Sequence, residues 1–136
     1  MDHKLIIKNI QQQQFEKIYF LHGEEPYFID AICDAIVDKA MDESERDFNQ
    51  TIVYGKEADA GSIIADAKSY PMMGERRLVV IKEAQEFKEI DLLESYFEHP
   101  VYTTIFVICY KYKKFDTRKK LIKTAASKGL VFLSEK

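Results

Sequence analysis

The residues with the clearest potential for chemistry follow a short apolar run at 17–22 and precede a helical pattern. In a nucleotide-binding protein, such a junction carries GxxxxGK[ST], whose backbone amides and lysine bind phosphate. Here a single glycine is followed by two glutamates and a proline, and no lysine is present. The carboxylates repel phosphate, and proline lacks an amide hydrogen. The sequence predicts a degenerate P-loop position without ATPase function, at Gly23, Glu24, Glu25 and Pro26.

The run at 77–83 is the place for the second half of a nucleotide site. A Walker B pattern ends an apolar strand with an acid that helps to hold magnesium. This run ends in Val80-Ile81-Lys82-Glu83-Ala84, so Lys82 stands where the first acid is needed. Because both halves of the site are degenerate, we expect a scaffold that no longer acts on nucleotides and needs no cofactor.

Other residues that could do chemistry lie apart in the sequence. His3, His22 and His99 show no metal-ligand spacing, so no metal is predicted. The two cysteines fall in apolar patterns and form no CxxC, which favours separate buried thiols. One enzymatic alternative remains, an unrecognised site in which His22 acts as a base at a strand end. The other interpretation of His22 is a polar residue that closes a strand.

Short apolar runs alternate with helical patterns along the whole chain. The predicted strands are 17–22, 48–54, 77–83, 104–110 and 129–135. The predicted helices are 2–14, one that begins at Pro26, 58–69, 88–98 and 116–128, the last capped by Asp116 or Thr117 and ended by Gly129. Runs that are apolar at nearly every position are typical of strands buried on both faces. The pattern predicts an α/β fold, a mostly parallel five-stranded sheet with helices on both faces.

Length and composition agree with one ordinary globular domain. The 136 residues fit a single domain, and 46% of them are hydrophobic. The formal net charge of −3 excludes a global positive field for nucleic acid. No apolar run approaches the ~20 residues that span a bilayer, and the N-terminus does not resemble a signal peptide. We therefore expect a cytoplasmic protein without membrane contact.

The segment Ser69–Arg77 is unusual because two methionines occupy a helix-to-strand connection. Pro71 disfavours helix at Tyr70, and Gly74 permits a turn of the backbone. Met72 and Met73 either fold back to plug the end of the sheet or project and bind a partner, a use to which flexible methionine is suited. In a parallel sheet this connection lies at the edge opposite the degenerate P-loop position.

Bases interleaved with aromatics make 111–120 the most basic run of the chain. Such a run can contact nucleic acid, with an affinity that falls steeply as salt rises. The residues for this contact would be Lys113, Lys114, Arg118 and Lys119. The alternative interpretation is a solvated helix face.

Three segments together resemble a known family. IYFLHGEEPYFID, SYPMMGERRLVVIKEA and KYKKFDTRKKL, in this order and spacing, resemble the delta subunit of bacterial DNA polymerase III. The resemblance runs from about residue 15 to the end and covers only the first domain of that family. It implies that residues 1–136 are one domain at the N-terminus of a longer protein, without the family's later collar domains.

The resemblance also implies a fold and a role. The family's first domain is similar to an AAA+ module whose P-loop is lost, and the subunit is non-catalytic. It binds the sliding clamp (the beta subunit) and helps to open the ring for loading onto primed DNA, using ATP bound by other loader subunits, which it joins through the later domains. DNA contact is then weak or indirect. The family's apolar clamp-binding pair, often leucine and phenylalanine, maps onto Met72 and Met73, flanked by Tyr70, Pro71, Gly74 and Arg76.

Overall fold

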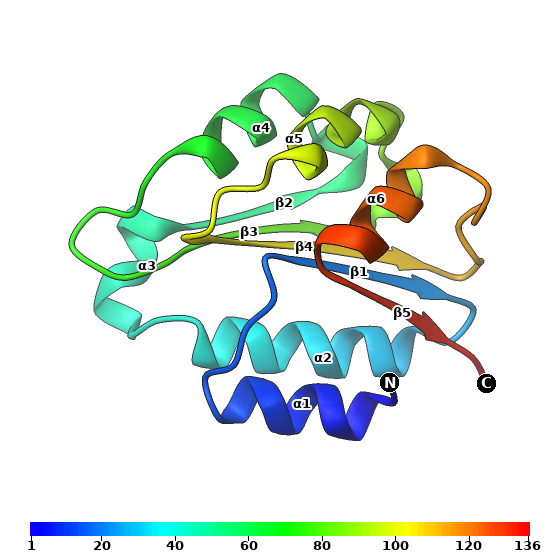
Figure 1. Ribbon diagram of the computed structural model, residues 1–136, viewed down its shortest axis with the longest axis horizontal. Helices are drawn as coiled ribbons and strands as arrows, with labels where there is room; N and C mark the ends of the chain where they lie inside the picture. The colour runs from blue at the N-terminus through cyan, green and yellow to red at the C-terminus, as the bar shows by residue number, and fades with distance from the viewer.

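A computed structural model describes residues 1–136 and shows one parallel sheet between two layers of helices (Figure 1). The sheet order is β2-β3-β4-β1-β5, and every neighbouring pair is parallel. The strands are β1 (Ile18–Gly23), β2 (Gln50–Tyr54), β3 (Arg77–Lys82), β4 (Thr104–Lys111) and β5 (Leu130–Ser134). The predicted α/β fold class is confirmed.

The helices divide between the two faces of the sheet. They are α1 (His3–Gln11), α2 (Pro26–Lys39), α3 (Glu43–Asn49), α4 (Ala60–Lys68), α5 (Glu94–Glu98) and α6 (Lys120–Lys128), with short 3-10 turns at Gly55–Glu57, Ala84–Glu86 and Ile90–Leu93. In Figure 1, α1 and α2 cover the lower face, whereas α4, α5 and α6 cover the upper one. None of these helices combines the length and the apolar character that spanning a bilayer requires.

Alternation along the central strands divides the core into two clusters. On β1, Ile18 and Phe20 face α4, α5 and α6, whereas Tyr19 and Leu21 face α1 and α2. Every residue of β1 is buried. Since both faces need apolar side chains, the strand loses the polar alternation of a one-sided sheet, and this explains its continuous apolar sequence.

The observed elements differ from the predicted ones at several places. The predicted strand 48–54 begins only at Gln50, because 43–49 form α3, which was not predicted. Its signal was present in the sequence: Asp42 and Glu45 form a capping box at its start. The predicted helix 88–98 is a 3-10 turn followed by α5, and the predicted helix 2–14 ends at Gln11.

The start of the last helix was also predicted wrongly. α6 begins at Lys120, and its N-cap position, Lys119, makes no side-chain cap. Asp116 does not cap the helix because both of its carboxylate oxygens accept hydrogen bonds from Arg118. This pairing stabilises a turn over 116–119 instead. The predicted end of the helix at Gly129 is confirmed.

Gly23 closes β1 with a backbone that other residues rarely adopt. Its φ is +136°, and a Cβ added there would lie 2.1 Å from the carbonyl oxygen of Ser134. The end of β5 therefore packs directly on the backbone of Gly23. A side chain at this position would force the two strands apart.

We predict that Gly23→Ala lowers the free energy of unfolding by more than about 2 kcal/mol, because it combines backbone strain with overlap of main-chain atoms. Gly61→Ala is the matched control, since a Cβ there meets only the side chain of Asp59 at 3.4 Å and the position is helical. The control should be neutral or stabilising by up to about 1 kcal/mol. Urea unfolding of both variants measures the difference. Equal stability of the two would contradict the packing argument.

Candidate functional site

The degenerate P-loop position is filled by the chain itself. The amide of Glu25 donates to the carbonyl oxygen of Ser134 at 3.4 Å, and the Ser134 hydroxyl donates to the carbonyl oxygen of Glu25 at 2.6 Å. The amide of Tyr27 donates to the Glu25 carboxylate at 3.1 Å. At the first two positions of α2, Pro26 has no amide hydrogen and the Tyr27 amide is already bonded. This helix end therefore offers phosphate fewer free backbone amides than a P-loop supplies.

A buried lysine, Lys111, lies at the same end of the strands as the degenerate P-loop position. The Lys111 ammonium group is 2.6 Å from a carboxylate oxygen of Asp30 and 3.2 Å from one of Glu83. Burial disfavours the charge on Lys111, but hydrogen bonds to both carboxylates outweigh it and raise its pKa. For Glu83, burial is outweighed by hydrogen bonds from Gln85 and Lys111, which lower its pKa. The acid that follows β3 is thus neutralised by a lysine of β4.

His22 lies in the packed interior at the end of β1. Its side chain is 2% exposed, and its Nδ1 accepts a hydrogen bond from the amide of Phe115 at 2.9 Å. Burial, together with the charge of Lys114, lowers its pKa to about 4. This geometry is that of a polar residue closing a strand, because the atom that would act as a base is already bonded to the backbone.

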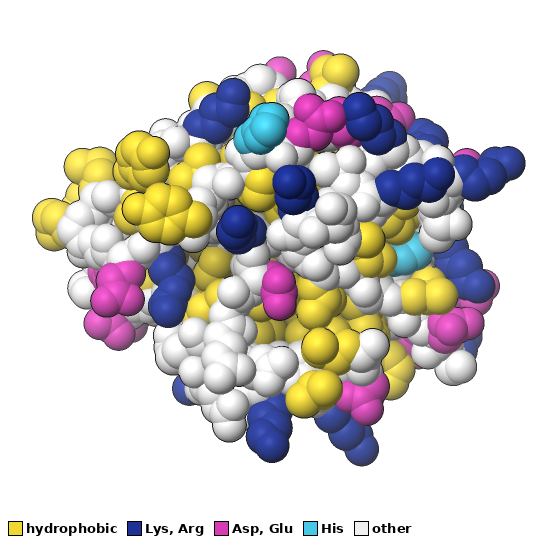
Figure 2. Space-filling model, viewed as in Figure 1, with side chains coloured by type: hydrophobic (Ala, Val, Ile, Leu, Met, Phe, Trp, Pro, Cys, Tyr) yellow, Lys and Arg dark blue, Asp and Glu magenta, His cyan; other side chains and the backbone are white.

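The apolar side chains predicted to bind a partner project from the opposite edge. Met72 is 57% exposed and Met73 is 80% exposed, and Tyr70 beside them is 69% exposed. Figure 2 shows hydrophobic side chains gathered at the left of the molecule, where the loop between α4 and β3 lies in Figure 1. The interpretation in which both methionines plug the end of the sheet is therefore wrong.

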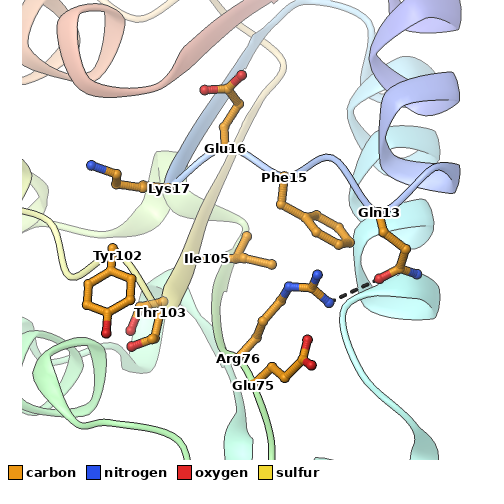
Figure 3. Close-up of a pocket in the computed structure, with 10 residues that line it drawn as sticks. Gln13, Phe15, Glu16, Lys17, Glu75, Arg76, Tyr102, Thr103 and Ile105 are labelled. Carbon is orange, nitrogen blue, oxygen red and sulfur yellow. Dashed lines mark hydrogen bonds between the residues drawn. The ribbon is translucent and has the colours of Figure 1, made fainter.

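The backbone of this loop is tied to the domain at its middle and at its end. At its middle, the side-chain amide of Asn49 makes two hydrogen bonds with the backbone of Met72, each 2.7 Å long. Near its end, the Arg76 guanidinium donates to Gln13 Oε1 at 3.0 Å and stacks over the ring of Phe15 at 4.6 Å (Figure 3). Arg76 also donates to the carbonyl oxygen of Ala40. The Arg76 guanidinium is therefore bonded within the chain and helps to hold the loop.

A cavity lies beside the loop, at the amino ends of β1 and β4. Its volume is about 270 Å³, and Phe15, Arg76 and Tyr102 are among the residues that line it (Figure 3). Tyr102 is 78% exposed, so this edge carries an aromatic ring in addition to the methionine pair. The cavity and the loop together give this edge an uneven, partly apolar surface.

The basic run is largely paired with the chain's own acids. Lys114, Arg118, Lys119 and Lys120 contact Glu135, Asp116, Asp91 and both Glu94 and Glu98, respectively. Lys113 instead lies 5.9 Å from the centre of the Tyr110 ring. These acids reduce the positive potential that phosphates would meet. Nucleic-acid contact through Lys113, Lys114, Arg118 and Lys119 stays a prediction.

The fold and these two edges define a class of protein. It is a parallel α/β domain in which contacts within the chain occupy the first strand-to-helix junction, and an apolar loop projects from the opposite edge. The family model "DNA polymerase III, delta subunit" matches residues 19–134. The chain belongs to the DNA polymerase III delta subunit family.

Relatives and solved structures agree with this assignment. The chain is 34% identical over 138 aligned positions to the DNA polymerase III subunit delta of Bacillus subtilis, covering 94% of this chain and 39% of the relative. The structure of the B. subtilis DNA clamp loader delta protein YqeN matches with a TM-score of 0.86 and 29% identity, over 98% of this chain and 42% of that one. The chain therefore spans about two fifths of the proteins that it matches.

More distant structures share the fold alone. A Thermotoga maritima protein related to the DNA polymerase III gamma subunit matches with a TM-score of 0.60 and 13% identity, over 100% of this chain and 46% of that one. RuvB, a Holliday junction branch migration motor of the same organism, matches with a TM-score of 0.53 and 14% identity, over 98% of this chain and 43% of that one.

The buried His22 predicts a specific loss of stability in acid. Its pKa is about 4 when folded against 6.5 ordinarily, so the unfolded chain binds more protons between these values. The contribution of His22 is fully present above about pH 6.5 and is lost as the pH falls toward 4. We expect His22→Asn, which keeps an acceptor for the Phe115 amide but does not titrate, to lose less stability than the wild type between pH 7 and 4.5. Urea unfolding at both values tests this; an equal loss in both proteins would contradict it.

Proposed function

We propose that this chain is a non-catalytic domain of a clamp loader that binds the sliding clamp and helps to open its ring during DNA replication. The observation that carries the proposal is the exposed Met72–Met73 pair on a tethered loop, in a chain of the delta family. Tyr70, Pro71 and Gly74 flank the pair in the proposed contact. Arg76 contributes by holding the loop.

The physical basis is burial of the pair in an apolar pocket of the clamp. A side chain of this kind at the centre of an interface contributes roughly 2 kcal/mol or more. Methionine is unbranched and polarisable, so it adapts to a pocket whose shape differs from that required by leucine and phenylalanine. An exposed apolar pair without such a partner would be an aggregation liability.

Opening of the ring requires more than affinity. A bound protein shifts the clamp toward its open form only by the difference between its affinities for the open and closed forms. The domain's own nucleotide junction is occupied by Glu25, Ser134 and the Lys111 ion pairs. In this proposal the energy for the cycle comes from ATP bound by other loader subunits. Their contacts lie in the part of the relatives that this chain does not span.

We predict that the double variant Met72→Ala/Met73→Ala loses clamp binding by at least tenfold, because truncation removes most of the apolar contact at both positions. Titration calorimetry of the 136-residue chain against the sliding clamp of the same organism measures the change. Leu92→Ala is the matched control, since Leu92 is an aliphatic side chain 58% exposed on the 3-10 turn Ile90–Leu93.

The melting temperature of each variant must stay at the wild-type value for the comparison to hold. Loss of binding in the double variant alone supports the proposed function. Two results would contradict it: absence of binding by the folded wild-type chain, or binding by the double variant as strong as that of the wild type.

Salt dependence separates clamp binding from nucleic-acid binding by the basic run. Neutralisation of phosphates makes the logarithm of affinity fall with the logarithm of salt, with a slope of about −0.7 per phosphate for single strands. Since most of the run is ion-paired, we expect weak oligonucleotide binding that Lys113→Glu/Lys114→Glu abolishes, with clamp binding unchanged. Fluorescence anisotropy between 50 and about 200 mM salt tests this. Tight oligonucleotide binding with a steep slope would favour the nucleic-acid function instead.

A further inference from the structure

Asn49 is a polar side chain buried completely beneath the exposed methionine loop. It is 0% exposed at the end of α3, 23 positions before its partner Met72. Its Nδ2 donates to the carbonyl oxygen of Met72, and its Oδ1 accepts from the amide of Met72, both at 2.7 Å. One side chain thus satisfies both backbone groups of a residue whose own side chain points into solvent.

The residue that follows this tether has an unusual backbone. Met73 has a φ of +56°, in the left-handed region that residues other than glycine rarely adopt. Such a conformation costs on the order of 1 kcal/mol and persists only where the surroundings impose it. The Asn49 hydrogen bonds precede it directly, and they are the surroundings that hold the start of this turn. The order at Met72 and Met73 therefore comes from α3, since their side chains are exposed, whereas Arg76 holds the end of the loop through Gln13, Phe15 and Ala40.

Gly74 lets the next part of the loop pack closely against α3. A Cβ at this position would lie 3.1 Å from Nδ2 of Asn49 and would overlap the carboxylate of Glu45. The backbone can approach α3 this closely because glycine has no side chain. Three consecutive residues of the loop are thus placed by the end of one short helix.

We propose that Asn49 is a positioning residue, which holds the Met72–Met73 loop in its binding conformation and raises affinity for the clamp without touching it. This inference rests on the proposed function. A loop that is already ordered loses less conformational entropy on binding, so more of the apolar contact energy is retained as affinity. Asn49 itself cannot contribute a contact to the partner, because it is fully buried under the loop.

The test compares variants that differ in these two hydrogen bonds. Asn49→Ala removes both bonds, and Asn49→Leu removes both while filling the buried space, so at least one should fold. Asn49→Asp keeps an acceptor for the Met72 amide and loses the donor. We expect clamp affinity to fall roughly tenfold in the Ala and Leu variants and less in the Asp variant.

Ser134→Ala is the matched control for stability. Ser134 is also 0% exposed, and its hydroxyl also bonds a backbone carbonyl, but at the opposite edge of the sheet. Its loss should lower the melting temperature by a similar amount and leave clamp affinity within twofold of the wild type. A merely structural role of Asn49 would affect binding no more than this control does.

Amide hydrogen exchange tests the tether without the clamp. In the wild type the Met72 amide should be protected, and in Asn49→Ala or Asn49→Leu it should exchange at least tenfold faster, while the amide of Val80 in β3 stays unchanged. Faster exchange together with weaker clamp binding supports the inference. Unchanged exchange, or unchanged clamp affinity with a wild type that binds, overturns it. If the wild type itself does not bind, the proposed function fails and the role in clamp binding fails with it, whereas exchange at Met72 still shows whether Asn49 orders the loop.

Discussion

Burial of the parallel sheet on both faces is the constraint on which the rest of the structure depends. The central strands carry apolar side chains toward α1 and α2 on one face and toward α4, α5 and α6 on the other. With both faces covered by helices, the two edges formed by the strand ends are where loops and strand termini come together. The difference between these edges decides what the domain can do.

The carboxyl edge is closed by interactions within the chain. Ser134 occupies the backbone of the degenerate P-loop position, and Lys111 supplies a positive charge between Asp30 and Glu83. These contacts satisfy the Glu25 amide and neutralise the Glu83 carboxylate, the acid that follows β3. This edge therefore stabilises the fold through contacts within the chain.

The amino edge shows the opposite arrangement, with ordered backbone and exposed side chains. Asn49 holds the middle of the loop between α4 and β3 and Arg76 holds its end, while the side chains of Met72 and Met73 remain in solvent. An apolar pair on a tethered loop suits recognition of a preformed pocket, because little conformational freedom remains to be lost. The proposed clamp contact and the proposed role of Asn49 are two parts of this one arrangement.

The sequence alone determined the fold class and the family, because strand burial and local motifs depend on contiguous residues; the degenerate P-loop position stays a prediction. It predicted Met72 and Met73 as a partner site but left open whether they project. Only the tertiary structure decided that, since the Met72 backbone is held by Asn49 at the end of α3, a helix that was not predicted, while both methionine side chains are exposed. The roles of Asn49, Lys111 and Ser134 likewise required the fold, because their partners are distant in sequence. Met72 lies 23 positions from Asn49, Asp30 lies 81 positions from Lys111, and Glu25 lies 109 positions from Ser134. Hydrogen bonds and ion pairs between such distant residues leave no local pattern to read.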